Sequence, residues 1–243
     1  MNEIASPQNA KFKVWTSLLE ARGIKKAQRA IVSGRKLVQE FLEQNPGAAE
    51  DILFSPKTEP IKFPSHVNAY SLASPLFKAI DVMGTHSPLL IVKTPEAEAW
   101  TSVAPDGLEL VLALSDPGNM GAVLRSAEAF GVTRVILTEE SCSPFLPKAI
   151  RSSSGACFRI PLANTGPLAN VDASPAVALD MQGESLKKFS WPKDLYLILG
   201  EEGRGIPQSL AVTSISIPMQ GKVESLNAMA AVSIALYSYR ISR

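Results

Sequence analysis

Apolar residues in the first hundred positions are spaced first as in helices and then as in strands. Between Asn9 and Arg22 they recur every three or four positions, and the same spacing returns after Gly34, so both stretches are predicted to be helices. Ser74-Pro75 should begin a further short helix, with proline at its first position. Short apolar runs predict three strands, at residues 51–54, 67–70 and 89–92. The pattern therefore predicts a compact α/β unit over residues 1–95.

From residue 107 the alternation becomes more regular, and it predicts a second α/β unit over residues 107–243. Between the units, residues 96–106 are poor in β-branched residues and flanked by proline, so they are expected to form a linker. Helical patterns occur at 122–130 and 226–239. Almost fully apolar runs predict five strands, at residues 108–114, 134–137, 176–179, 196–199 and 215–217. Buried strands that alternate with helices are typical of a parallel sheet covered on both faces.

Composition excludes several classes of protein. The chain has 243 residues, of which 46% are hydrophobic and 19% charged, as in ordinary globular proteins. No apolar stretch is long enough to span a bilayer, and the N-terminus lacks the layout of a signal peptide. Cys142 and Cys157 cannot build a disulfide framework, and with only two histidines a metal enzyme is not expected. We therefore expect a cytoplasmic protein without a metal ion.

The near-neutral total charge of +1 hides local clusters of basic residues. Residues 1–36 hold eight Lys and Arg against two acids, and residues 141–171 hold Lys148, Arg151 and Arg159 with no acid at all. Such clusters attract polyanions. A single cluster is better explained by a solvated helix face, but two of them shift the balance towards RNA or DNA as a partner.

Three loops that follow predicted strands carry the polar residues of the second unit. Ligands of parallel α/β sheets bind outside the carboxyl ends of the strands, so these loops are the candidate site. In the first, Asp116 to Gly121 form a tight turn that leads into a helix with Arg125. A structural salt bridge explains Arg125 equally well, and its apolar neighbours predict a packed boundary.

The second and third loops are rich in glycine and in helix-starting residues. Residues 200–207 contain three glycines but also Glu201 and Glu202, which excludes a Walker-type phosphate loop and suits a neutral or cationic ligand; a flexible turn is the alternative. Residues 217–227 precede an alanine-rich helix, for which Ser225 is the expected N-cap. The chain has no Gly-x-Ser-x-Gly elbow, and no Gly-x-Gly-x-x-Gly follows the first strand of the second unit, so neither a serine hydrolase nor a standard dinucleotide site is supported.

In this order, the three loops resemble the three motifs of the SpoU (TrmH-like) family of RNA ribose 2′-O-methyltransferases in the SPOUT superfamily. The matching residues are Asn119, Gly121 and Arg125, then Leu199, Gly200, Glu202 and Gly205, then Ile217-Pro218-Met219 with Ser225-Leu226-Asn227. Residues 143–155 resemble a further family segment. The N-terminal unit resembles the small L30e-like RNA-binding domain that often precedes the catalytic one. Two departures are Ser33, where the family usually has Glu, and Ala228-Met229, where it has Val-Ser or Val-Ala.

The resemblance implies a fold, a cofactor and an assembly. The family's catalytic domain has a deep trefoil knot that holds S-adenosylmethionine, and its members are usually homodimers through this domain. Gly200, Ile217 and Leu226 would hold the cofactor, with Leu179 and Met219 as further candidates. Asn119 and Arg125 would face the ribose, and Glu202, Ser225 and Asn227 would shape the site through hydrogen bonds to the loop or to Arg125.

The resemblance also implies an RNA substrate. Lys148, Arg151, Arg159 and Arg35, with the rest of the basic N-terminal unit, would bind RNA phosphates, and the two-unit layout favours rRNA over tRNA. Two other functions stay open: a non-catalytic, knotted RNA-binding dimer, and a knotted methyltransferase that modifies a tRNA base. The first motif, from Asn119 to Arg125, favours a ribose acceptor over a base.

Overall fold

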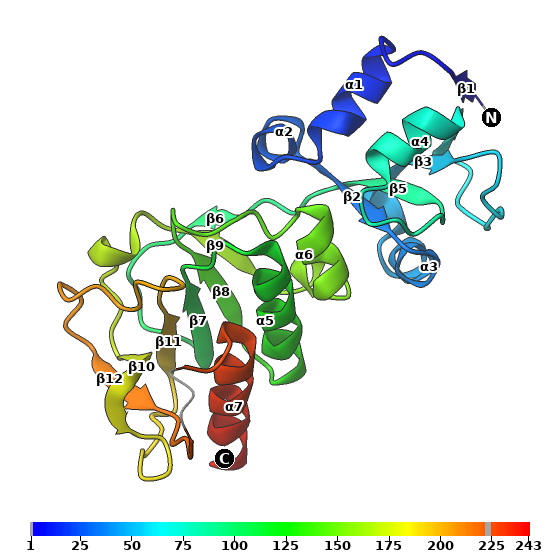
Figure 1. The fold of residues 1–243 in the computed structure, drawn as a ribbon. Helices are drawn as coiled ribbons and strands as arrows, with labels where there is room; N and C mark the ends of the chain where they lie inside the picture. Colours follow the sequence, from blue (N-terminus) through cyan, green and yellow to red (C-terminus); the bar gives the residue numbers. More distant parts are fainter. Residues whose placement is uncertain (1, 222–224) are drawn as a thin grey trace. The chain divides into compact units, whose positions relative to one another are not determined.

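The structure is a computed structural model that describes residues 2–221 and 225–243, and its chain folds into two compact units (Figure 1). The first contains Met1–Pro95 together with Ser143–Phe158, and the second contains Glu96–Cys142 and Arg159–Arg243. The boundaries expected from the sequence were 1–95 and 107–243. Contacts thus group residues 143–158 with the first unit and residues 96–106 with the second.

The first unit is built on a mixed five-stranded sheet with the order β1-β4-β3-β5-β2. β1, β4 and β3 are parallel, whereas β5 runs antiparallel to its neighbours β3 and β2. The strands are β1 Asn2–Ile4, β2 Arg29–Ser33, β3 Ala49–Phe54, β4 Asn68–Leu72 and β5 Leu89–Lys93. The helices are α1 Ala10–Ser17, α2 Ala21–Ala27, α3 Arg35–Gln44, α4 Ser74–Ile80 and α6 Pro147–Ser152, with short 3₁₀ turns at Pro46–Ala48 and Ala156–Phe158.

Most elements predicted for this unit are confirmed, but the first helix is wrong in one respect. The stretch from Asn9 to Arg22 is broken into α1 and α2, with the buried Leu18 in the turn. The helices approach so closely that a Cβ on Gly23 would lie 1.8 Å from the carbonyl oxygen of Ser17. Apolar spacing does not reveal such a break, because both helices bury the same kind of residue. Strands β1 and β2 were not predicted.

Aromatic packing explains why residues 143–158 belong to the first unit. The ring of Phe158 lies between those of Phe41 and Phe145, with centroid distances of 5.0 and 5.5 Å. Phe41 belongs to the buried face of α3. Because burying apolar and aromatic surface is the main favourable term in folding, this contact holds the segment in place although it lies about a hundred positions further along the chain.

The second unit is built on an all-parallel, seven-stranded sheet with the order β12-β10-β11-β7-β8-β9-β6. The strands are β6 Glu98–Ala99, β7 Leu108–Leu112, β8 Arg134–Leu137, β9 Leu162–Asn164, β10 Ala176–Ser185, β11 Leu195–Leu199 and β12 Thr213–Ser216. The helices are α5 Pro117–Ala129 and α7 Ala228–Ile241, with a 3₁₀ turn at Leu168–Asn170. The predicted parallel sheet is confirmed, as are its five predicted strands, while β6 and β9 were not predicted.

The core of the second unit lies around the central strands. β7 and β11 are buried along their whole length, which is why their sequences are almost continuously apolar. Trp100 packs edge-on against Tyr196 of β11 at a centroid distance of 5.7 Å. Residues 96–106, expected as a linker, therefore contribute both the edge strand β6 and a core aromatic ring.

A buried ion pair fixes β8 beside β7. Glu109 is only 1% exposed, and its carboxylate accepts two hydrogen bonds of 2.9 Å from the guanidinium of Arg134. The hydrogen bond to Glu109 raises the pKa of Arg134, against the opposing effect of burial.

No helix among the described residues is both long and apolar enough to cross a membrane.

Candidate active site

The three polar loops begin at the same edge of the parallel sheet. β11 and β7 are neighbours in register, with Leu199 opposite Leu112, and β10 and β12 continue the sheet beyond β11. Because parallel strands end on the same side, the loops that follow β7, β11 and β12 emerge close together. The residues predicted from three distant segments are thus placed where a ligand of this fold class binds.

Asn119 joins all three loops through its side-chain amide. Its Nδ2 donates to Oε1 of Glu202 in the loop after β11. Its Oδ1 accepts a hydrogen bond of 3.2 Å from Nδ2 of Asn227, which follows β12. Asn119 is itself held at the start of α5, where the N-cap Asp116 accepts from its backbone N–H at 2.8 Å. One amide that donates on one side and accepts on the other therefore ties the predicted motifs together.

The loop after β11 is closed by its own backbone. Glu201 and Gly205 exchange hydrogen bonds of 3.1 and 2.8 Å in an antiparallel bridge. Gly200 is packed so tightly against this bridge that a Cβ would lie 2.2 Å from the carbonyl oxygen of Gly205. Only glycine fits there without moving backbone, and this closed loop presents Glu202 to Asn119.

The loop before α7 is fixed by Asn227, and not by the residue expected to cap the helix. Asn227 is the N-cap of α7, and its Oδ1 accepts from the backbone N–H of Met229 at 2.9 Å. The sequence prediction that Ser225 is the cap is therefore wrong; Ser225 is exposed two positions earlier. Both residues have good capping side chains, so only the position of the first helical turn decides between them. Residues 222–224 of this loop lie outside the described residues.

Arg125 lies on α5, six positions after Asn119, and is exposed. The predicted packed boundary is thus wrong for this residue. Within residues 2–221 and 225–243 it forms no hydrogen bond or ion pair, and Glu202 and Asn227 bond to Asn119 instead. Its guanidinium is therefore available to an anionic or polar ligand.

Two serines that the sequence did not single out lock the helices that carry these residues. Ser126 of α5 and Ser233 of α7 share a hydrogen bond of 2.8 Å between their hydroxyl oxygens, and the two helices lie side by side (Figure 1). A hydroxyl pair between small residues permits close packing. No motif indicates such a pair, because its two members are more than a hundred positions apart.

A model of the SpoU rRNA Methylase family matches residues 108–237. The chain belongs to this family. The matched segment contains every residue of the network around Asn119, as well as Arg125. In this member of the family, the three motifs are therefore brought together by strand order and by specific side-chain hydrogen bonds.

Two relatives align with nearly the whole chain. The first, the ribosomal RNA small subunit methyltransferase G 2 of Syntrophobacter fumaroxidans, is 41% identical over 98% of this chain, which spans only 49% of that relative's length. The second, the 23S rRNA (guanosine(2553)-2′-O)-methyltransferase RlmP of Bacillus subtilis, is 29% identical over 99% of this chain and 100% of its own length. The structure of the SpoU methyltransferase AviRb of Streptomyces viridochromogenes with the cofactor AdoMet shares the fold, with a TM-score of 0.81, 23% identity and coverage of 96% and 98% of the two chains.

The residues predicted to hold the cofactor surround the same sheet edge. Gly200 directly follows β11 and is buried, and Leu179 of β10 pairs with Ile215 of β12. Ile217 directly follows β12, and it and Leu226 are half-buried. Met219 is 40% exposed. No group of three or more His, Cys, Asp or Glu side chains in the described part of the chain is placed to hold a metal ion.

The residues predicted to bind RNA phosphates are spread over both units. Arg159 is paired with Glu128 of α5, with 2.8 Å between Nη2 and Oε2, and Nη1 of Arg35 lies 3.1 Å from Glu59. Arg151 donates to the carbonyl of Met83 at 3.2 Å, and Lys148 is exposed on α6. The acid-free stretch around Arg159 thus receives an acid from a different segment, which charge counting along the chain does not detect.

Proposed function

We propose that this chain transfers a methyl group from S-adenosylmethionine to a ribose 2′-hydroxyl of ribosomal RNA. One observation carries the proposal: Asn119 is hydrogen-bonded to both Glu202 and Asn227, so the three motif loops form one site. Family membership over residues 108–237 supports the same chemistry. The relative RlmP, which this chain matches over its full length, is named for this reaction on 23S rRNA.

The residues at the sheet edge fit S-adenosylmethionine. When bound, this cofactor supplies a methyl group activated by a positively charged sulfur. Gly200 and Ile217 provide backbone groups at the ends of β11 and β12, and Leu226 with Leu179 provides half-buried apolar surface. AdoMet is also the cofactor in the AviRb complex, whose fold this chain shares. Met219 is more exposed and belongs to the rim of this site.

Arg125 is proposed to act on the acceptor ribose by electrostatics. A guanidinium stays protonated in proteins and cannot serve as a general base. It can stabilise the negative charge that develops on the attacking oxygen, or hold an adjacent phosphate by two parallel hydrogen bonds. Asn119 would orient the ribose beside it. Placing the hydroxyl in line with the methyl group is itself a large source of rate acceleration.

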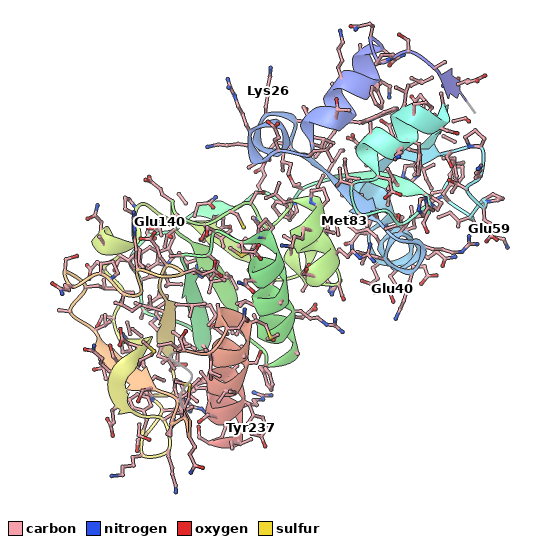
Figure 2. All side chains as sticks on the ribbon, viewed as in Figure 1. Lys26, Glu40, Glu59, Met83, Glu140 and Tyr237 are labelled. Carbon is pink, nitrogen blue, oxygen red and sulfur yellow. The ribbon has the colours of Figure 1, made fainter. Side chains whose placement is uncertain are left out.

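We also propose that the chain works as a homodimer through its second unit, with the family's trefoil knot in that unit. Helix α7 exposes a row of large apolar residues at spacings of three and four, namely Ile234, Tyr237 and Ile241, which are 40%, 56% and 64% exposed (Tyr237 is labelled in Figure 2). A contiguous apolar face of this kind marks an interaction site. The proposal also includes the two domains expected from the sequence, at residues 1–95 and 107–243. It places the protein in the cytoplasm, where rRNA is available.

The test uses purified full-length chain, tritiated S-adenosylmethionine and a bacterial 23S rRNA transcript. We expect saturable cofactor binding by calorimetry, methyl transfer to the RNA, and a 2′-O-methylated nucleotide in the mapped product. Arg125→Ala should keep cofactor binding but lose most transfer. RNA binding without any cofactor binding would refute the proposal in favour of a non-catalytic scaffold, and a methylated base would refute the ribose assignment.

A further inference from the structure

The first unit contains a cavity of about 620 Å³ that the proposed methyl transfer does not use. It lies at the end of the mixed sheet where β2, β3 and β4 begin and β5 ends, and one wall is formed by α1. Pockets of 300 to 1,000 Å³ are typical of small-ligand sites. The volume is sufficient for one nucleotide.

The two carboxylates in this cavity are already neutralised. Asp51, which is 7% exposed, accepts from Nζ of Lys11 at 3.2 Å and from the indole nitrogen of Trp15 at 3.3 Å. Glu50 forms a two-point ion pair with Arg29, one contact of which measures 3.3 Å between Nη2 and Oε1. Because both acids have cationic partners within the wall, they do not repel an incoming anion strongly.

The remaining charge around the cavity is positive. Lys93, the last residue of β5, is exposed and forms no ion pair in the described part of the chain. Helix α2 ends at Ala27, just before β2 begins at this end of the sheet, and it exposes Lys25 and Lys26. Lys26 extends outward from the helix in Figure 2. An excess of cations around a concave site selects an anionic ligand.

Two fixed polar side chains line the cavity beside these cations. Nδ2 of Asn68 donates to Oδ1 of Asp51 at 3.1 Å, which leaves its Oδ1 as an acceptor. Nε2 of His66 lies 3.0 Å from the carbonyl oxygen of Pro46, and this hydrogen bond holds the ring in place. Polar groups held in place can pair with the edge of a nucleobase.

We propose that this cavity receives one unpaired nucleotide of the RNA substrate, with its phosphate against Lys93 and its base edge against Asn68 and His66. Proteins recognise RNA sequence mainly at unpaired nucleotides, which they read by hydrogen bonds to base edges. The inference rests on the proposed function, because it assumes an RNA substrate. It adds a second contact point in the first unit, separate from the methyl-transfer site.

The test compares Lys93→Gln with Lys57→Gln in the full-length chain. Lys57 is also an exposed lysine of the first unit, but it lies three residues after the end of β3 at Phe54, beyond the opposite end of that strand from Glu50 and Asp51. With a 23S rRNA transcript, Lys93→Gln should weaken filter binding about three- to tenfold and reduce the slope of log Kd against log salt by about 0.7 to 1. Lys57→Gln should leave both values near wild type. Turnover at saturating RNA and cofactor affinity should be unchanged in both variants.

Ultraviolet crosslinking of wild-type protein to the same transcript provides a readout that needs no variant. We expect crosslinked peptides that contain His66 or Asn68, and Asn68→Ala should weaken RNA binding while the melting temperature stays close to wild type. Equal behaviour of the two lysine variants, together with crosslinks only outside the cavity, would overturn the inference while methyl transfer persists. Crosslinks in the cavity without cofactor binding or methyl transfer would instead refute the proposed function and keep the nucleotide site.

Discussion

Replacing Gly200 with alanine would place a methyl group where the loop after β11 has no room. The added Cβ would lie 2.2 Å from the carbonyl oxygen of Gly205 and 2.9 Å from the backbone nitrogen of Ile206. Both neighbours are backbone atoms, so no side-chain rotation can relieve the clash. The loop must open, and the two hydrogen bonds between Glu201 and Gly205 open with it.

The cost can be estimated from these contacts. Overpacking a tight site costs about 1–3 kcal/mol, and each lost backbone hydrogen bond costs about 0.5–1.5 kcal/mol. Together these terms give a loss of about 2–6 kcal/mol for the closed loop, with a smaller loss of global stability, because the loop can open while β11 stays in the sheet. At about 1.4 kcal/mol per factor of ten, the closed loop that presents Glu202 to Asn119 becomes at least about 30-fold less populated.

The assay measures methyl transfer and cofactor binding in Gly200→Ala, with Gly203→Ala as the matched control. Gly203 lies in the same loop at a φ of +87°, and its Cβ would meet nothing within 4 Å. It should therefore cost only about 1–2 kcal/mol of backbone strain and leave more activity than Gly200→Ala. The reasoning is refuted if Gly200→Ala keeps wild-type activity, or if the control loses as much.

Three further predictions concern charged groups of the second unit. Arg125→Lys should lose most methyl transfer although it keeps the charge, because lysine cannot make the two parallel contacts of a guanidinium; wild-type turnover in Arg125→Ala would remove its assignment. Arg134→Ala should lower the free energy of unfolding by about 3 kcal/mol in urea titrations, because Glu109 is left buried and without its cationic partner. Adding Glu109→Leu to this variant should restore part of the loss. A double variant whose loss equals the sum of the two single losses would contradict this. Burial raises the pKa of Glu140, but hydrogen bonds to its carboxylate, including one from the backbone of Leu168, lower the pKa by more than burial raises it. The net pKa shift of Glu140 is therefore downward from 4.5. Its stabilisation should be complete above about pH 4.5 and be lost as the pH falls through the lowered pKa; Glu140→Gln should thus be destabilised at pH 7 but not at strongly acidic pH, and an equal deficit at both would refute this.

The amino-acid pattern alone was enough to predict five strands and the two long helices of the second unit, and the segments that carry its chemistry. Fully apolar runs such as 108–112 and 195–199 encode strands that are buried on both faces, and the helices between them require a parallel arrangement. Polar residues directly after such strands indicate a ligand site at the sheet edge. These inferences succeed because each depends on neighbours within a few positions along the chain.

Which of these residues meet depends on the order of the strands in the folded sheet. Asn119 bonds to Glu202 and Asn227 because β7 and β11 are neighbours, and because the parallel strand β12 ends at the same edge of the sheet. Arg159 is paired because folding brings Glu128 beside it. The packing of residues 143–158 with the first unit has the same origin. Hydrophobic periodicity records whether a side chain is buried but not against what, so contacts between distant segments are fixed only when the strands take their order.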